Sequence, residues 1–171
     1  GYASVSTESE CSAGQGYPHT WQLRKYGVPV SLSMDTSVWW SADLFSAMRG
    51  TLNADRVRVH MDAHERGETI VNHPLRAETV VEWATIGGAK ALGLGDKVGS
   101  LEVGKQADVV LIKNDRSPAM FPVLNPYGHV VYQAGRGDVH TVLVTGQVLK
   151  HGGQLVGAAD KVDKAREVVG Q

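Results

Sequence analysis

Cysteine is almost absent from this sequence, which contains only Cys11 in 171 residues. An internal disulfide is therefore excluded, and the sequence has no zinc-binding pattern built from cysteines. A chain without disulfides is typical of a reducing compartment, and we expect a cytoplasmic protein.

An excess of charge of one sign and long apolar runs are also missing. Lys and Arg number 17 and Asp and Glu 18, which gives a net charge of −1. Such a balance does not indicate a positively charged surface that would bind nucleic acid. No apolar run is long enough to span a bilayer, and no N-terminal segment resembles a signal peptide. We therefore expect neither nucleic-acid nor membrane partners. Because the first residue is Gly1 rather than Met, we expect a start that is processed, truncated or incompletely recorded.

The first third of the chain has the pattern of a βαβ unit. Residues 2–7 are a β-branched run that predicts a strand, and the apolar residues 28–34 predict a second strand. Residues 20–26 between them predict a helix that ends at Gly27. Residues 8–19, rich in Gly, Ser and Pro, predict a loop. This order predicts two parallel strands with a crossover helix.

The remaining elements divide into a helical part and a mainly β part. Ser41 is a candidate N-cap for the first helix of the helical part. The character changes near residues 95–99, where glycines interrupt the chain. The patterns predict helical stretches over 43–53, 54–66, 77–92 and 160–169, and strands within 98–113, 130–133 and 139–150, the last with a Thr145-Gly146 hairpin turn.

Three stretches, in this order and spacing, carry a family resemblance. They are Gly27–Thr36 (GVPVSLSMDT), Trp83–Gly93 (WATIGGAKALG) and Gly99–Val110 (GSLEVGKQADVV). Together they resemble the amidohydrolase superfamily, and more closely its cytosine-deaminase-like and triazine-chlorohydrolase-like branch.

The resemblance implies an α/β fold that is the C-terminal portion of a larger enzyme. That enzyme would be a (β/α)₈ TIM barrel with a small β-sandwich. Residues 1–97 would be the end of the barrel, with its seventh and eighth strands and the helices that follow them. Residues 98–150 would be the C-terminal part of the sandwich, and residues 151–171 a tail with a helix.

Asp35 is the candidate catalytic and metal-binding residue. It follows the second predicted strand, a position where aspartate also serves as a turn or N-cap residue. The resemblance favours a ligand for a divalent metal, zinc or iron, that also accepts a proton from the metal's water. Ser33-Met34 replaces the Gly-Thr that usually precedes this aspartate in the family.

Five further residues near the implied barrel mouth are candidate substrate contacts. Glu8 and Glu10 follow the first strand and either face substrate or form a solvated acidic loop. Tyr17 and His19 lie in the next loop, which the resemblance places above the mouth, and either of them is a candidate to contact substrate. Trp39 could stack on a flat ring or pack against the next helix.

His60 and His64 have the i, i+4 spacing of helical zinc pairs. Met61 stands where the zinc-protease pattern requires glutamate, and the flanking residues are charged. We therefore interpret this pair as part of a solvated helix face.

The resemblance implies a metal-dependent hydrolase that acts on C–N bonds other than peptide bonds. Its substrate would be a small nitrogen heterocycle, which it would deaminate or dechlorinate. The family's metal-binding histidines have no match here, so we expect the chain alone to be inactive. The alternative is a non-catalytic remnant or an assembly module without its own metal site. Exposed edges of the two barrel strands predict self-association or a homo-oligomer.

Overall fold

A computed structural model describes residues 1–115, 117–157 and 159–170, without the side chains of residues 159–162 and 169. Positions 116, 158 and 171, within the predicted sandwich segment and tail, lie outside this description. The fold is α/β, as the sequence predicts. The described helices include none with the length and apolar character needed to cross a bilayer.

The first two strands form the predicted parallel pair. Strand β1 (Ala3–Val5) and strand β2 (Val30–Leu32) pair in register, with Ala3 opposite Val30. The chain passes between them through α1 (Thr7–Ser12) and α2 (Thr20–Lys25). The prediction that residues 8–19 are a loop is therefore wrong at its start. The Glu10 carboxylate accepts a hydrogen bond from the Ser6 backbone N–H at 2.8 Å, which satisfies a free donor where α1 begins.

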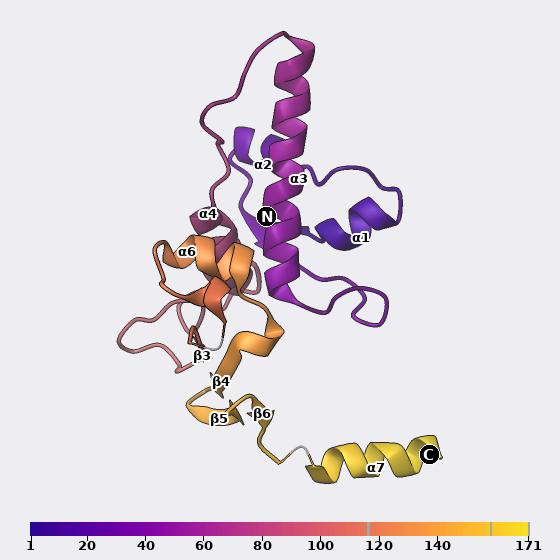
Figure 1. Ribbon diagram of the computed structural model, residues 1–171, viewed down its shortest axis with the longest axis vertical. Coiled ribbons are helices and arrows are strands. Elements are labelled where there is room, and N and C mark those ends of the chain that lie inside the picture. Colours follow the sequence, from indigo (N-terminus) through magenta and orange to yellow (C-terminus); the bar gives the residue numbers. More distant parts are fainter. Residues whose placement is uncertain (116, 158, 171) are drawn as a thin grey trace.

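The long helix α3 (Leu44–Glu65) organises the upper part of the molecule (Figure 1). It joins the two predicted stretches 43–53 and 54–66 into one helix. Its N-cap is Asp43, whose carboxylate accepts a hydrogen bond from the Phe45 backbone N–H at 2.8 Å. Ser41 is therefore not the cap as predicted, because its side chain and backbone N–H bind Glu8 instead.

The predicted helix over 77–92 is present but not uniform. It runs as α4 (Ala77–Glu82), the π-helical turn η1 (Trp83–Gly87) and α5 (Gly88–Ala91). The hydrophobic core lies between these helices, α3 and the two strands. Its buried members are Val5, Val30, Met48, Leu52, Leu75, Val80, Trp83 and Val131.

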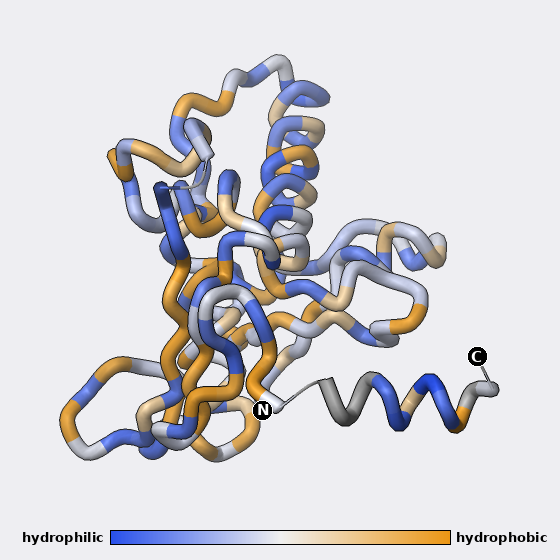
Figure 2. The backbone as a smooth tube through the Cα atoms, turned by 60° about the horizontal axis from the view of Figure 1, so that its bottom comes forward, coloured by the Kyte–Doolittle hydropathy of each residue, from blue (hydrophilic) through white to orange (hydrophobic). Residues whose placement is uncertain are grey.

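The second sheet consists of four antiparallel strands in the order β3-β4-β5-β6. Its strands are β3 (Val109–Ile112), β4 (Val139–Val144), β5 (Gln147–His151) and β6 (Gln154–Leu155). The predicted hairpin joins β4 to β5 through Thr145 and Gly146, which both have positive φ. This lower part of the molecule in Figure 1 turns toward the viewer in Figure 2, where it shows many hydrophobic positions.

Of the two strands predicted within 98–113, the first is wrong. Residues 98–108 form a series of turns, in which Gly99 and Gly104 have positive φ. The Lys105 ammonium donates hydrogen bonds to the Gly95 carbonyl at 2.7 Å and to the Ser100 hydroxyl at 2.5 Å. Only the end of the predicted segment forms a strand.

The predicted strand over 130–133 is also wrong. These residues belong to the π-helical turn η3 (His129–Gln133), which continues α6 (Pro126–Gly128). Asn125 caps this helix, and its side chain accepts a hydrogen bond from the Gly128 N–H at 2.8 Å. The Arg49 side chain donates to the backbone oxygens of Val131 and Ala134 and holds the turn against α3. Short 3₁₀ turns η2 (Pro118–Met120) and η4 (Arg136–Asp138) precede and follow it.

Helix α7 (Ala159–Val169) confirms the predicted helix over 160–169. It projects away from the rest of the molecule in both views (Figures 1 and 2).

Candidate functional site

The candidate site lies at the edge where the parallel strands β1 and β2 end. The Ser33 backbone N–H donates a hydrogen bond to the Val5 carbonyl at 2.9 Å, one residue beyond the end of β2. Because both strands point the same way, the segments that follow them leave from one edge. Glu8 and Asp35 therefore enter from that edge, as the sequence predicts for a parallel pair.

Asp35 stands in an unusual backbone conformation. Its φ is 56°, in the left-handed region, which few residues other than glycine adopt. Its backbone N–H donates to the Ser33 hydroxyl at 3.1 Å, and its Oδ1 accepts from the Thr36 hydroxyl at 3.2 Å. Within the described residues, Oδ2 has no hydrogen-bond partner, and the residue is exposed. This carboxylate is oriented by its neighbours and keeps one oxygen free.

The carboxylates of Glu8 and Glu10 both accept hydrogen bonds from within the chain. Glu8 Oε2 accepts hydrogen bonds from the Ser41 N–H at 3.1 Å and from the Ser41 hydroxyl at 2.5 Å. This contact joins the segment after β1 to the loop after β2. Glu10 binds the Ser6 N–H as described above. Glu8 thus braces the loop that carries Asp35, whereas Glu10 stabilises the start of α1.

Trp39 lies in the same loop as Asp35. Its backbone N–H donates to the Thr36 carbonyl at 3.1 Å, which closes a turn just after Asp35. The residue is 76% exposed, so in the described part of the chain its indole is largely free of packing against the next helix. Of the five substrate candidates, Trp39 lies in the same loop as Asp35, and Glu8 contacts that loop through Ser41.

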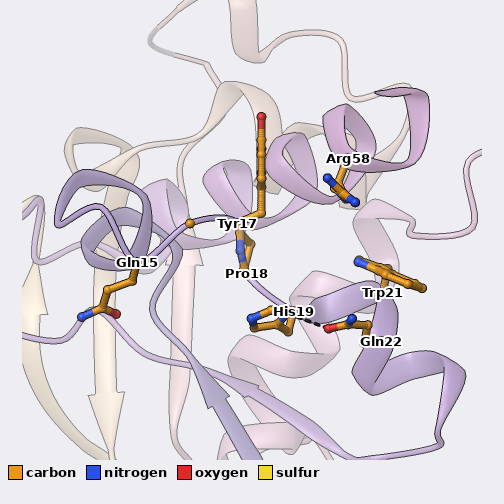
Figure 3. Close-up of a pocket in the computed structure, with 8 residues that line it drawn as sticks. Gln15, Tyr17, Pro18, His19, Trp21, Gln22 and Arg58 are labelled. Carbon is orange, nitrogen blue, oxygen red and sulfur yellow. Dashed lines mark hydrogen bonds between the residues drawn. The ribbon is translucent and has the colours of Figure 1, made fainter. Parts of the chain in front are cut away.

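Tyr17 and His19 gather at a different place. They line a shallow pocket of about 200 Å³ together with Trp21, Gln22 and Arg58 (Figure 3). The His19 Nδ1 lies 2.6 Å from the Gln22 amide oxygen, and the Tyr17 hydroxyl contacts the Met61 sulfur at 3.5 Å. Arg58 lies about 21 Å along the α3 axis from Leu44, the first residue of the helix after the Asp35 loop. The structure therefore does not bring this pair together with Asp35.

The described residues contain no group of three His, Cys, Asp or Glu side chains able to hold a metal ion together. A catalytic zinc takes about three protein ligands. The described residues therefore contain no complete zinc site of their own.

Asp55 forms a buried ion pair that the sequence did not predict. Its carboxylate is buried and accepts hydrogen bonds from the Thr20 hydroxyl at 2.6 Å and from Arg24 at 2.9 and 3.0 Å. The three residues connect α2 to α3 and fix the segment that leads into β2. A separation of 31 residues between Arg24 and Asp55 gives no local signal of this ion pair.

Comparisons with known proteins agree with this architecture. The family model described as "Amidohydrolase family" matches residues 5–149. The chain is 33% identical over 155 residues to the 5-methylthioadenosine/S-adenosylhomocysteine deaminase 1 of Syntrophus aciditrophicus (strain SB). That alignment covers 90% of this chain and 32% of the deaminase.

Two solved structures have similar folds. An adenosine deaminase from Xanthomonas campestris with bound zinc superimposes with a TM-score of 0.79 and 27% identity, over 96% of this chain and 36% of that protein. The atrazine chlorohydrolase of Arthrobacter aurescens TC1 complexed with zinc gives a TM-score of 0.69 and 23% identity, over 98% and 35% of the two chains. The chain thus spans about a third of the length of these proteins. By its sequence and by its fold, the chain belongs to the amidohydrolase family.

Proposed function

We propose that this chain is the C-terminal part of a metal-dependent hydrolase that removes an amino group from a nitrogen heterocycle. Family membership supports hydrolysis, and the names of the deaminase relatives support deamination of an adenine-type nucleoside. The likeness to the chlorohydrolase extends to the fold alone and leaves dechlorination without support of its own. β1 and β2 would be the last two barrel strands, and β3–β6 part of the sandwich.

The observation that carries the proposal is Asp35 at the carboxyl-terminal edge of a parallel strand pair. Barrel enzymes place their sites at this edge. A bound divalent metal would lower the pKa of a water molecule at that edge toward neutrality. Asp35 would act as one ligand and as the acceptor of the proton that the water loses. A cytoplasmic location and the choice between zinc and iron stay predictions.

The chain's own contacts prepare Asp35 for these roles. Thr36 holds Oδ1, which leaves Oδ2 available to a cation or a proton. Glu8 fixes the loop through Ser41, so the carboxylate is presented from a braced segment. Trp39, exposed in that loop, is placed to cover a flat heterocyclic ring.

Ammonia release tests the proposed reaction. A longer enzyme that carries this chain should release ammonia from 5-methylthioadenosine or S-adenosylhomocysteine and should release no chloride from a chlorotriazine. The 171-residue chain alone should release neither, because it supplies one metal ligand. Turnover by the isolated chain, or chloride release without deamination, would contradict the proposal.

A further inference from the structure

Two histidines outside the candidate site meet across two elements. His60 lies on α3, and His73 lies in the segment that joins α3 to α4. Their Nε2 atoms are 3.4 Å apart, and the ring planes meet at 63°. The partner of His60 is thus His73 rather than His64, which has the helical spacing that the sequence suggested.

The distance between the two nitrogens fits a shared metal ion better than a direct hydrogen bond. Hydrogen bonds to nitrogen donors are commonly 2.7–3.2 Å long, shorter than this contact. Two imidazole ligands about 2.0–2.1 Å from one tetrahedral zinc ion stand about 3.3–3.4 Å from each other. The observed separation of 3.4 Å between the two Nε2 atoms matches this spacing.

The surroundings select the nitrogen that binds and give the ion access. His73 Nδ1 is buried and has no hydrogen-bond partner among the residues that the structure describes, so Nε2 is the nitrogen of that ring left to bind a ligand. His60 is exposed, which opens the pair to solvent. Neutral imidazole is a preferred ligand of Zn²⁺, Cu²⁺ and Ni²⁺. We propose that His60 and His73 form a two-histidine site for a divalent transition metal of this class, with water completing the coordination.

This site is separate from the edge that carries Asp35. His60 lies about 24 Å along the α3 axis from Leu44, near the opposite end of the helix. A metal there would tie the segment before α4 to α3 and would reduce the freedom of that segment in the folded chain.

Neighbouring charges limit the strength of the site. Burial and the Arg56 guanidinium hold the pKa of His73 below its usual value, and the same guanidinium disfavours a cation. Asp55 acts in the opposite sense. Arg56 is held aside by the Tyr132 hydroxyl at 2.8 Å. With two protein ligands and one opposing charge, the site should bind zinc more weakly than a three-ligand catalytic centre.

Zinc titration of the 171-residue chain, followed by calorimetry in a chelator-free buffer at pH 7.5, tests the site. The chain should bind one Zn²⁺ at this pair. His60→Gln and His73→Gln should each weaken binding by at least about tenfold. His64→Gln, on the same helix, is the matched control and should leave the affinity unchanged. Because His60 is exposed, His60→Gln should fold even if the change at the half-buried His73 disturbs its segment.

Four results would overturn the proposal. No zinc binding by the chain would exclude the site. Equal zinc affinity in the unchanged chain and in His60→Gln would place the metal elsewhere. A loss of zinc binding confined to Asp35→Asn would assign the metal to the strand edge. A loss in His64→Gln without a loss in His73→Gln would show that the helical pair binds the ion.

Discussion

The backbone of Asp35 adopts a conformation that costs most residues about 1–2 kcal/mol. Aspartate and asparagine tolerate it better than others, because their short polar side chains can form local hydrogen bonds. Outliers of this kind gather at functional sites, where the surrounding structure maintains them. The positive φ was invisible in the sequence, whereas the position after a buried strand was not.

Asp35→Asn and Asp35→Val should therefore separate backbone strain from chemistry. Asn accepts the left-handed region, so we expect the free energy of unfolding to stay within about 0.5 kcal/mol of the unchanged chain. Val is β-branched and disfavours this region, so the free energy of unfolding of Asp35→Val should fall by about 1–2 kcal/mol. Urea unfolding followed by circular dichroism measures both changes. Equal stability of the two variants would show that the surrounding loop relaxes.

Glu102 provides a test of electrostatics at a single residue. Hydrogen bonds from Ser100 and Lys105, and the charge of Lys105, hold the pKa of this carboxyl below its usual value of 4.5. Since the folded chain binds the proton less readily than the unfolded chain, Glu102 stabilises the fold above about pH 4.5. That contribution is lost as the pH falls through the lowered pKa.

An NMR titration of the Glu102 carboxyl should give a midpoint below 4.5, and Ser100→Ala should raise that midpoint. The difference in unfolding free energy between the unchanged chain and Glu102→Gln should shrink as the pH falls. A midpoint that Ser100→Ala leaves in place would contradict the assigned contacts.

At the scale of elements, patterns that depend on local sequence predicted the structure well. The apolar run before Asp35 predicted β2, and its pairing with β1 followed from the crossover between them. The pattern over 130–133 misled, because two adjacent valines suggest a strand although the Asn125-Pro126 start signal belongs to a helix. The contacts of Arg49 that hold this turn come from a helix about 80 residues away and have no local signature.

In the candidate site, too, features with a local sequence pattern could be predicted and tertiary contacts could not. Its position at the end of β2 could be predicted from chain order. The Glu8–Ser41 contact could not, because it joins two loops that meet only in the fold. The separation of Tyr17 and His19 from Asp35 depends on how α2 packs against α3 through Asp55, which is again a tertiary contact.

Gly87 tests how closely the π-helical turn η1 lies against β2. A Cβ at this position would lie 2.8 Å from the Val30 carbonyl oxygen, which belongs to the paired strand and cannot move freely. Gly87→Ala should cost about 1–3 kcal/mol of stability. Gly88→Ala is the matched control, since its Cβ would meet nothing closer than 4.0 Å. It should leave stability unchanged or raise it by up to about 1 kcal/mol, as alanine favours helix. Equal effects in urea unfolding would mean that η1 is not pressed against the strand.

At the scale of the whole molecule, uncovered apolar surface is the dominant feature. Within the described residues, β1 and β2 pair only with each other, so each has one free edge. Apolar residues on the second sheet and the turn after it are also exposed, among them Val110, Leu111, Val148, Leu149 and Val156. Free strand edges and apolar patches favour association.

We expect the isolated chain to self-associate in a concentration-dependent way. Sedimentation velocity at several dilutions should show species larger than a monomer of 18.3 kDa. A charged residue on a strand edge should oppose this association, so Ser4→Lys on β1 should shift the distribution toward the monomer. The same substitution at exposed Ser12, which lies outside any strand, should not. A monodisperse monomer at all concentrations would contradict the prediction.

The Asp35 carboxylate is the proposed metal ligand and proton acceptor at the strand edge. The most direct test measures zinc content and kcat of a longer enzyme that carries this chain, with Asp35→Asn compared with Asp43→Asn. Asp43 is a matched control because asparagine caps helices as well as aspartate does. We predict that Asp35→Asn lowers kcat by at least about 100-fold and reduces bound metal, whereas Asp43→Asn changes neither. Near-normal turnover and metal content in Asp35→Asn would contradict the account.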